Sequence, residues 1–222
     1  MAAETDGNGS PSEVLLDERV CDCCQTAAVR TRHGVLVAYR DRSADEVRDI
    51  SLVRRDAGGW TKPYALAPDG WKIPGCPVNG PALDARDDDV VAAWFTMLEE
   101  EPVVQVAFST DGGEAFSQPR RIDAGLPLGR VDVVMLPSRD ALVVWLETTK
   151  SGEATIRARH VGQRGGMDAS FVVAETSAKR ASGFPRLAQV RDQLFFAWTD
   201  AGEKPQVRVA SLALPQAWRW TR

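Results

Sequence analysis

The segment Asp140-Ala-Leu-Val-Val-Trp145-Leu-Glu decides the fold, because the chain contains four versions of it. In each version a short apolar run leads into an aromatic residue and then into polar residues. The other three are Gly34-Val-Leu-Val-Ala-Tyr39-Arg-Asp, Asp89-Val-Val-Ala-Ala-Trp94-Phe-Thr and Gln193-Leu-Phe-Phe-Ala-Trp198-Thr-Asp. The steps from Tyr39 to Trp94, Trp145 and Trp198 are 55, 51 and 53 residues, which indicates an internal repeat.

Further extended segments complete each repeat unit. A short stretch precedes the apolar run, as in Gly80-Pro-Ala-Leu-Asp, and an alternating segment follows the aromatic residue, as in Gln206-Val-Arg-Val-Ala-Ser. Alternation with a period of two is typical of half-buried strands. A turn and a second aromatic residue close the units, at Trp60, Phe116, Phe171 and Trp218. Each unit therefore predicts about four strands.

Four-stranded units that recur at about fifty residues are typical of propeller blades. We therefore predict an all-β fold, a β-propeller of about four four-stranded blades. Residues 1–13 are expected to form a flexible tail and residues 14–222 the propeller domain, with units at about 19–75, 76–128, 129–182 and 183–222. The repeated aromatic residues are expected to fill the space between neighbouring blades, because large rings bury much apolar area.

Composition and charge exclude several classes of protein. Of the 222 residues 44% are hydrophobic and 26% charged, as in an ordinary globular protein. The net charge of −4 without a basic cluster argues against nucleic-acid binding. No apolar run approaches the roughly 18 residues of a membrane helix, so we expect a soluble chain without membrane insertion. The amino terminus lacks a basic segment and an apolar core, so this chain carries no secretory signal peptide.

The second unit contains the motif Ser109-Thr-Asp111-Gly-Gly113-Glu-Ala-Phe116. It fits the Asp-box, Ser-x-Asp-x-Gly-x-x-aromatic, and with this motif the chain resembles the sialidase (neuraminidase) superfamily of BNR-repeat β-propellers. The resemblance covers residues 19 to 220, with a degenerate second copy around Gly59-Trp60. In that family the Asp-box is a structural hairpin motif remote from catalysis, which implies a structural role for Ser109, Asp111, Gly113 and Phe116.

The resemblance also carries implications for the whole molecule. Catalytic members of the superfamily typically have six blades, so the four units here could form a small ring, an open arc or part of a larger propeller. An open arc would expose apolar sheet faces, which predicts self-association through the open edges. The family resemblance implies an extracytoplasmic location if an export signal was removed; the sequence alone leaves the compartment unknown.

Charged residues gather where a propeller would have its central mouth, at the starts of innermost strands and in the loops after second strands. The loop from Tyr39 to Asp49 holds seven charged residues after its tyrosine. Guanidinium groups suit a carboxylate or another small anion, and the resemblance implies an arginine trio, for which Arg48, Arg130 and Arg186 are candidates. The candidate ligand-binding residues are Arg40, Arg42, Arg48, Asp49, Asn79, Arg130, Asp132 and Arg186. The alternative is a solvated hairpin with its own ion pairs.

The sialidase catalytic set is not recognisable in the sequence. The family uses a tyrosine nucleophile activated by a glutamate, whereas this chain has only Tyr39 and Tyr64, both in the first unit. The leading hypothesis is therefore a binding propeller for a small anionic or carbohydrate ligand or a metal. One alternative is an exo-sialidase-like glycoside hydrolase with paired carboxylates, for which Asp41, Glu46 and Glu147 are candidates. Another is a structural or interaction module.

The four cysteines form a second candidate site. Cys21, Cys23 and Cys24 open the first unit and Cys76 opens the second, and Cys24 and Cys76 are one repeat apart. Equivalent positions on adjacent innermost strands lie close together in a propeller, so the four side chains are expected to meet. Grouped thiolates suit Zn or Cu(I), while an oxidising compartment favours disulfides. Metal, disulfide and free or redox-active thiols all remain open from the sequence.

Overall fold

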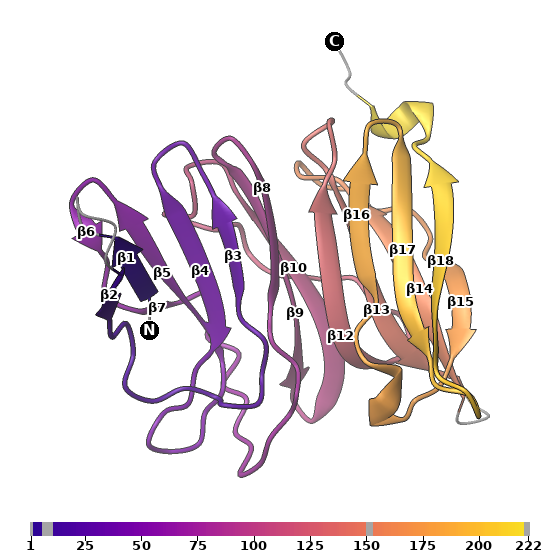
Figure 1. Cartoon of the computed structure of the whole chain (residues 1–222), viewed down its shortest axis with the longest axis horizontal. Coiled ribbons are helices and arrows are strands. Elements are labelled where there is room, and N and C mark those ends of the chain that lie inside the picture. The colour runs from indigo at the N-terminus through magenta and orange to yellow at the C-terminus, as the bar shows by residue number, and fades with distance from the viewer. Residues whose placement is uncertain (1, 6–10, 150–152, 220–222) are drawn as a thin grey trace.

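The computed structural model, which describes residues 2–5, 11–149 and 153–219, consists almost entirely of antiparallel sheets. Figure 1 shows four of these sheets side by side, in chain order from one end of the molecule to the other. We call them blades 1 to 4. The predicted all-β propeller of about four blades is therefore confirmed.

Within each blade the strands pair in chain order, except that β7 of blade 1 pairs with β5. Blade 1 contains β3 (Ala27–Arg30), β4 (Val35–Arg40), β5 (Ile50–Asp56), β6 (Gly59–Trp60) and β7 (Tyr64–Ala65). Blade 2 contains β8 (Ala82–Arg86), β9 (Asp89–Leu98), β10 (Glu101–Ser109) and β11 (Arg120–Arg121). Blade 3 contains β12 (Leu126–Met135), β13 (Ala141–Thr148), β14 (Ala154–Val161) and β15 (Phe171–Thr176). Blade 4 contains β16 (Arg186–Val190), β17 (Gln193–Asp200) and β18 (Gln206–Ala213), so it has three strands within the described residues.

The remaining elements are short. The segment expected to be a flexible tail contains β1 (Ala2–Thr5) and β2 (Pro11–Val14), which pair with each other in a separate two-stranded sheet. Two 3-10 helices, η1 (Arg180–Ser182) and η2 (Gln216–Trp218), lie before and after blade 4. In the described ranges no helix has the length and apolar character that a membrane crossing would require.

Strand β9 shows why the repeated apolar runs build blades. Successive side chains of a strand point to opposite faces of the sheet. Val90, Ala92 and Trp94 join the core between blades 1 and 2, whereas Val91, Ala93 and Phe95 join the core between blades 2 and 3. A strand that is buried on both faces must be apolar at every position, so the run carries no alternation. Trp94 and Trp145 are fully buried, which confirms the predicted packing of the repeated aromatics between blades.

The blades form an open arc. The innermost strands β3, β8, β12 and β16 contact one another in that order. Blades 1 and 4 stand at opposite ends of the row (Figure 1). The outer face of β17 accordingly differs from its inner face: Leu194 and Phe196 are buried against blade 3, whereas Phe195 is 37% exposed.

The connection from β10 to β11 is held by a compact set of side-chain hydrogen bonds. Ser109 Oγ accepts the backbone N–H of Gly113 at 2.9 Å and donates to Asp111 Oδ1 at 2.6 Å. The same carboxylate oxygen accepts the backbone N–H of Ala115 at 3.0 Å. Phe116 packs on the core between blades 1 and 2. These residues fix the turn and dock it on blade 1, where Tyr64 Oη donates to the carbonyl of Gly113.

Candidate functional site

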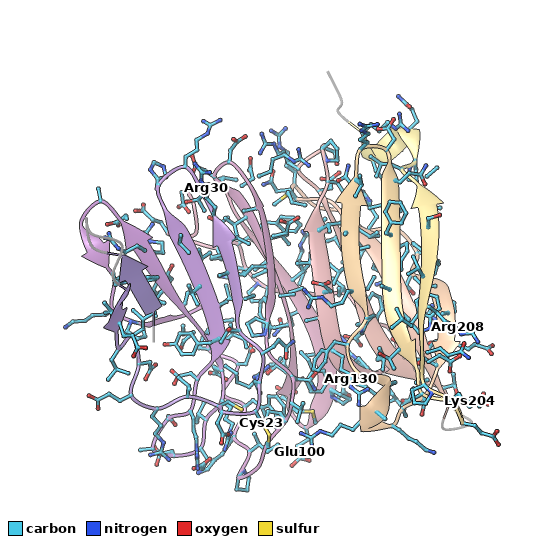
Figure 2. The ribbon with its side chains drawn as sticks, in the orientation of Figure 1. Cys23, Arg30, Glu100, Arg130, Lys204 and Arg208 are labelled. Atoms are coloured by element: carbon cyan, nitrogen blue, oxygen red, sulfur yellow. A yellow bond between two sulfur atoms is a disulfide. The ribbon has the colours of Figure 1, made fainter. Side chains whose placement is uncertain are left out.

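The strand starts and loops that were predicted to form a polar mouth lie at one end of the arc. Cys23, which precedes the innermost strand of blade 1, lies at the same end as Glu100, in the turn after β9 (Figure 2). Arg130 in β12 lies toward this end as well, whereas Arg30, at the far end of β3, lies at the opposite end. The topology therefore places the starts of innermost strands and the loops after second strands together, as expected for a propeller.

Arg40, a predicted ligand-binding residue, is fully buried at the end of β4. Its guanidinium donates to the backbone carbonyls of Asn79 at 2.5 Å and Phe95 at 2.6 Å, and to that of Arg48. It also lies 4.9 Å from the ring centroid of Trp71. Burial lowers the pKa of Arg40 to about 10, so the group stays charged at neutral pH. Its donors are used to join blade 1 to blade 2.

The charged residues of the loop after β4 form ion pairs and hydrogen bonds with one another and with nearby segments. Glu46 accepts hydrogen bonds from Arg42 at 2.8 Å, Arg48 at 2.9 Å and Arg19 at 3.2 Å. Hydrogen bonds from Arg42 and Arg48 lower the pKa of Glu46 to about 2. Asp49 accepts the backbone N–H groups of two residues in the following loop, Gly70 and Trp71. This arrangement corresponds to the alternative of an ion-paired hairpin.

The candidate arginine trio does not share a common partner among the described residues. Arg48 bonds Glu46, while Arg130 donates to Ser182 Oγ at 2.8 Å and to nearby carbonyls. Arg186 Nε lies 3.3 Å from Asp132 Oδ2. Asn79 is likewise committed, because its Oδ1 accepts the backbone N–H of Arg130 at 2.7 Å.

The two tyrosines, which were not catalytic candidates, and the candidates Glu147 and Asp41 all have structural partners. The Tyr39 hydroxyl donates to Asp17 at 2.6 Å, and burial together with this carboxylate raises the pKa of Tyr39. Burial also raises the pKa of Tyr64 to about 12. Glu147 accepts the indole N–H of Trp145 at 3.0 Å, and Asp41 accepts the hydroxyl of Ser51 at 2.9 Å. A raised phenol pKa opposes the phenolate that a tyrosine nucleophile requires.

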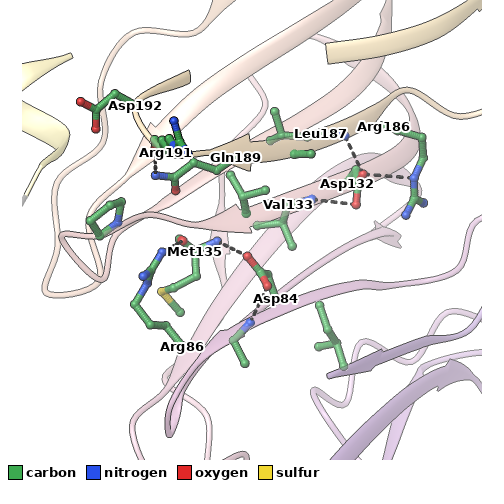
Figure 3. Close-up of a pocket in the computed structure, with 15 residues that line it drawn as sticks. Asp84, Arg86, Asp132, Val133, Met135, Arg186, Leu187, Gln189, Arg191 and Asp192 are labelled. Atoms are coloured by element: carbon green, nitrogen blue, oxygen red, sulfur yellow. Dashed lines mark hydrogen bonds and ion pairs between the residues drawn. The ribbon is translucent and has the colours of Figure 1, made fainter. Parts of the chain in front are cut away.

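A groove of about 750 Å³ runs over the innermost strands β8, β12 and β16 (Figure 3). We call it the central groove; its polar lining includes Asp84, Arg86, Asp132, Arg186, Gln189 and Arg191. Asp84 accepts the backbone N–H of Met135 at 2.7 Å, and Asp132 accepts that of Leu187 at 2.8 Å. Each aspartate therefore binds the innermost strand of the next blade. Burial raises the pKa of both carboxyl groups.

Two polar atoms of the central groove lack a hydrogen-bond partner within the described residues. They are Arg86 Nε, a donor, and Gln189 Oε1, an acceptor, and both are buried. The other ends of these side chains are engaged, since Gln189 Nε2 donates to the carbonyl of Arg191 at 2.9 Å. Most buried polar groups in proteins have a partner, and leaving one unsatisfied costs about 1–3 kcal/mol.

Sequence reasoning named Asp132 and Arg186 of this groove but missed Asp84, Arg86 and Gln189. The missed residues lie inside innermost strands, whereas the prediction placed the site at the starts of those strands. Asp84 and Arg86 are two positions apart in β8, so both side chains point to the same face of the sheet.

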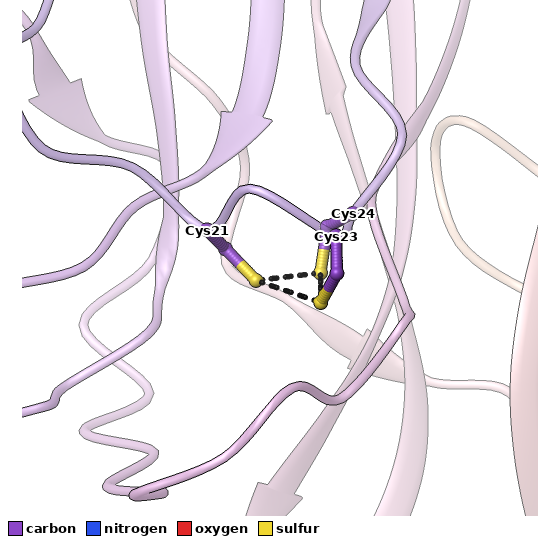
Figure 4. A group of neighbouring side chains, drawn as sticks. All are labelled: Cys21, Cys23 and Cys24. Atoms are coloured by element: carbon purple, nitrogen blue, oxygen red, sulfur yellow. Dashed lines mark hydrogen bonds between the residues drawn. The ribbon is translucent and has the colours of Figure 1, made fainter.

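The cysteines meet at the mouth of blades 1 and 2 (Figure 4). The Sγ atom of Cys21 lies 2.9 Å from that of Cys24 and 3.5 Å from that of Cys23. Cys23 forms a disulfide with Cys76, with their Cα atoms 6.2 Å apart, while Cys21 and Cys24 are free thiols. The predicted meeting of the two cysteine groups is confirmed, and the cluster Cys21, Cys23 and Cys24 has a geometry that can hold a metal ion.

Comparisons with known proteins define the fold class. No family model and no curated protein matches the sequence. Among solved structures, a Hadza microbial sialidase is 17% identical with a TM-score of 0.56 over 83% of this chain and 43% of its own. A Trypanosoma rangeli sialidase in complex with sialic acid is 10% identical with a TM-score of 0.55 over 94% of this chain and 38% of its own. A lectin from Burkholderia pseudomallei is 14% identical with a TM-score of 0.62 over 89% of this chain and 54% of its own.

These similarities show a sialidase-like β-propeller fold. The chain spans about two fifths of the length of the two sialidases and about half that of the lectin. Folds of this kind carry several activities, so the site and not the fold must carry a functional argument.

Proposed function

We propose that this chain is a binding propeller whose central groove holds a carbohydrate-like ligand, without sialidase turnover. The observation that carries the proposal is the central groove itself, which is lined by carboxylate, guanidinium and amide side chains from three neighbouring innermost strands. A sugar hydroxyl both accepts and donates hydrogen bonds, so a polyhydroxylated ring can pair with the carboxylates and with the guanidinium and amide groups of this lining.

The dimensions and charge of the central groove support this class of ligand. Its volume of about 750 Å³ lies within the range of small-molecule sites, about 300–1,000 Å³. Its lining contains both guanidinium and carboxylate groups, and Arg186 pairs with Asp132. A lining with both signs of charge favours a polyhydroxylated molecule over a highly charged one. The similarity to sialidases and to a lectin is consistent with this ligand class.

Titration calorimetry with sialic acid and a panel of neutral monosaccharides tests the proposal. Gln189→Leu removes the acceptor with little change of volume, so we expect at least a tenfold loss of affinity for the best-bound sugar. Stability should stay constant or rise, because a buried unsatisfied group is removed. Gln118→Leu, at an exposed position outside the groove, is the matched control. Equal affinity in both variants, or no binding of any sugar, would contradict the proposal.

The enzymatic alternative predicts a different result. A glycoside hydrolase using the mouth carboxylates would release the fluorophore from a fluorogenic sialoside or another glycoside. Loss of that activity in Asp41→Ala or Glu46→Ala would establish catalysis and overturn the binding-only function. We expect no turnover, because the two tyrosines are hydrogen-bonded and Glu46 is held by three arginines.

Metal binding is a second candidate function, favoured by the cysteine cluster. The sulfur atoms of Cys21, Cys23 and Cys24 lie within 4.8 Å of one another, a spacing that a single soft metal ion can bridge. Zinc and Cu(I) are the ions that grouped thiolates prefer. Metal analysis by mass spectrometry of protein purified without an affinity tag is the direct test, and stoichiometric metal lost in Cys24→Ser would support it.

A further inference from the structure

We propose that the four cysteines form a zinc site with four thiolate ligands. The Cys23–Cys76 disulfide, when it is formed, prevents zinc from binding there. In the oxidised state the Cys23–Cys76 bond occupies two of the four sulfur ligands. In the reduced state all four cysteines bind one Zn²⁺ ion. This inference rests on metal binding as the second candidate function and is independent of the ligand in the central groove.

The sulfur positions fit a tetrahedral zinc ion. A Zn–S distance of about 2.3 Å requires sulfur atoms about 3.8 Å apart in a tetrahedron. The separations of Cys23 Sγ from Cys21 Sγ and Cys24 Sγ are 3.5 and 3.9 Å. The separation of Cys21 Sγ and Cys24 Sγ is 2.9 Å and must lengthen, which side-chain rotation can provide.

Cys76 supplies the fourth ligand from an adjacent loop. It is exposed, and its Cα atom lies 6.2 Å from that of Cys23. While the two sulfurs are bonded to each other, neither is a thiolate. Opening the bond lets the Cys76 sulfur move to the remaining tetrahedral corner, since its loop faces solvent.

The change of state is a balanced two-electron step. A dithiol reductant gives two electrons and two protons to the Cys23–Cys76 bond, which breaks into two thiols, and the reductant closes into its own disulfide. Zinc then displaces the thiol protons to solvent as the four sulfurs bind it. Oxidation of the empty site by a disulfide reverses the first step.

Two buried guanidinium groups balance the charge of the loaded site. Four thiolates and one Zn²⁺ carry a net charge of −2. Arg48 Nη1 lies 3.3 Å from Cys21 Sγ, and the Arg40 guanidinium interacts electrostatically with both Cys21 and Cys24. Arg48 is almost fully buried, and its Nε atom has no hydrogen-bond partner within the described residues. The positive charges of Arg40 and Arg48 therefore lie where they would offset the negative charge of the thiolates.

The experiment compares zinc binding by the two redox states of the full chain. One sample is kept oxidised; the other is reduced with dithiothreitol, which is then removed without oxygen. Both receive zinc chloride, and bound zinc is measured by mass spectrometry after gel filtration. We expect about one zinc per reduced chain and at least tenfold less per oxidised chain. Alkylation after denaturation should modify two cysteines in the oxidised sample and four in the reduced one.

A variant separates the effect of the disulfide from metal binding itself. Cys24→Ser keeps the Cys23–Cys76 bond but removes a ligand, so the reduced variant should bind zinc at least a hundredfold more weakly. Its oxidised form should keep the wild-type circular dichroism spectrum, which shows that it folds. Equal zinc binding by both redox states would contradict control by the Cys23–Cys76 disulfide but would still support metal binding. No zinc in either state overturns both.

Discussion

At the scale of single residues, arginines decide how blades 1 and 2 are joined. Arg40 donates to three backbone carbonyls from different segments, a task that the planar guanidinium performs and a single ammonium group does not. Arg130 does the same for the connection before blade 4, through Ser182 and Gly183. These arginines therefore join segments that are far apart in the sequence, and much of the charge at this end of the arc is used within the chain.

The partly buried cluster around Glu46 makes stability depend on pH. Hydrogen bonds from Arg42 and Arg48 lower the pKa of Glu46 from its ordinary value of 4.5 to about 2. A carboxylate with a lowered folded-state pKa contributes stability above about pH 4.5, and this contribution is lost as the pH falls towards 2. Glu46→Gln should therefore flatten the pH dependence of the unfolding midpoint in urea over this window.

Salt supplies the control for that measurement. The Arg42–Glu46 pair is partly exposed, so 1 M sodium chloride should reduce the difference between wild type and Glu46→Gln. Identical pH profiles for the two proteins at low salt would show that the Arg–Glu contacts contribute nothing to folding.

The partners of individual polar residues could not be predicted from the sequence. Loop arginines such as Arg48 have the same chemistry whether they bind a ligand or a neighbouring loop, and sequence does not state which partner is near. Arg86 and Gln189 were missed for the opposite reason, because one member of an ordinary strand pattern carries no local signal. Cys76, by contrast, was placed correctly, since one repeat length separates it from Cys24.

At the scale of elements, the hairpin turn after β10 links two blades. Gly113 has φ of +92°, and a Cβ atom there would lie 2.7 Å from a methyl carbon of Leu36 in blade 1. Leu36 is fully buried, so it has little room to move. Gly112 also has a positive φ, +72°, but its Cβ would approach no atom closer than 3.4 Å.

These two glycines form a matched pair for mutation. Alanine at either position has the strain of a positive φ, about 1 kcal/mol, but only Gly113→Ala adds overpacking, about 1–3 kcal/mol. Gly113→Ala should therefore lower the free energy of unfolding in urea by more than Gly112→Ala does. Equal losses would mean that the turn moves away from Leu36 without cost.

The blades were predictable because the same pattern of buried residues recurs in each of them. A second strand buried on both faces gives a continuous apolar run ending in a large aromatic residue, as in β9 and β13, and this run is visible without structure. The pairing of β1 with β2 was not predictable, since Ala2–Thr5 and Pro11–Val14 contain little β-branched or aromatic character.

At the scale of the whole molecule, the arc leaves the outer face of blade 4 exposed. Four apolar side chains of this blade are strongly exposed: Val190 at 57%, Phe195 at 37%, Val207 at 78% and Val209 at 63%. The sequence did not distinguish a closed ring from an open arc, because the number of repeats does not determine the curvature of the row of blades. The arc also explains why β18 lacks the buried positions that β10 and β14 have.

An exposed apolar face of this kind favours association between copies of the chain. We predict that the average mass measured by light scattering rises with protein concentration. Val209→Lys should shift the protein towards the monomer, because a charged side chain in that contact loses its hydration. The fold should be unaffected, since the side chain is largely exposed. Val172→Lys, at a valine 50% exposed in blade 3, should associate like wild type. A wild-type mass that stays monomeric at every concentration would show that the face of blade 4 is stable in water alone.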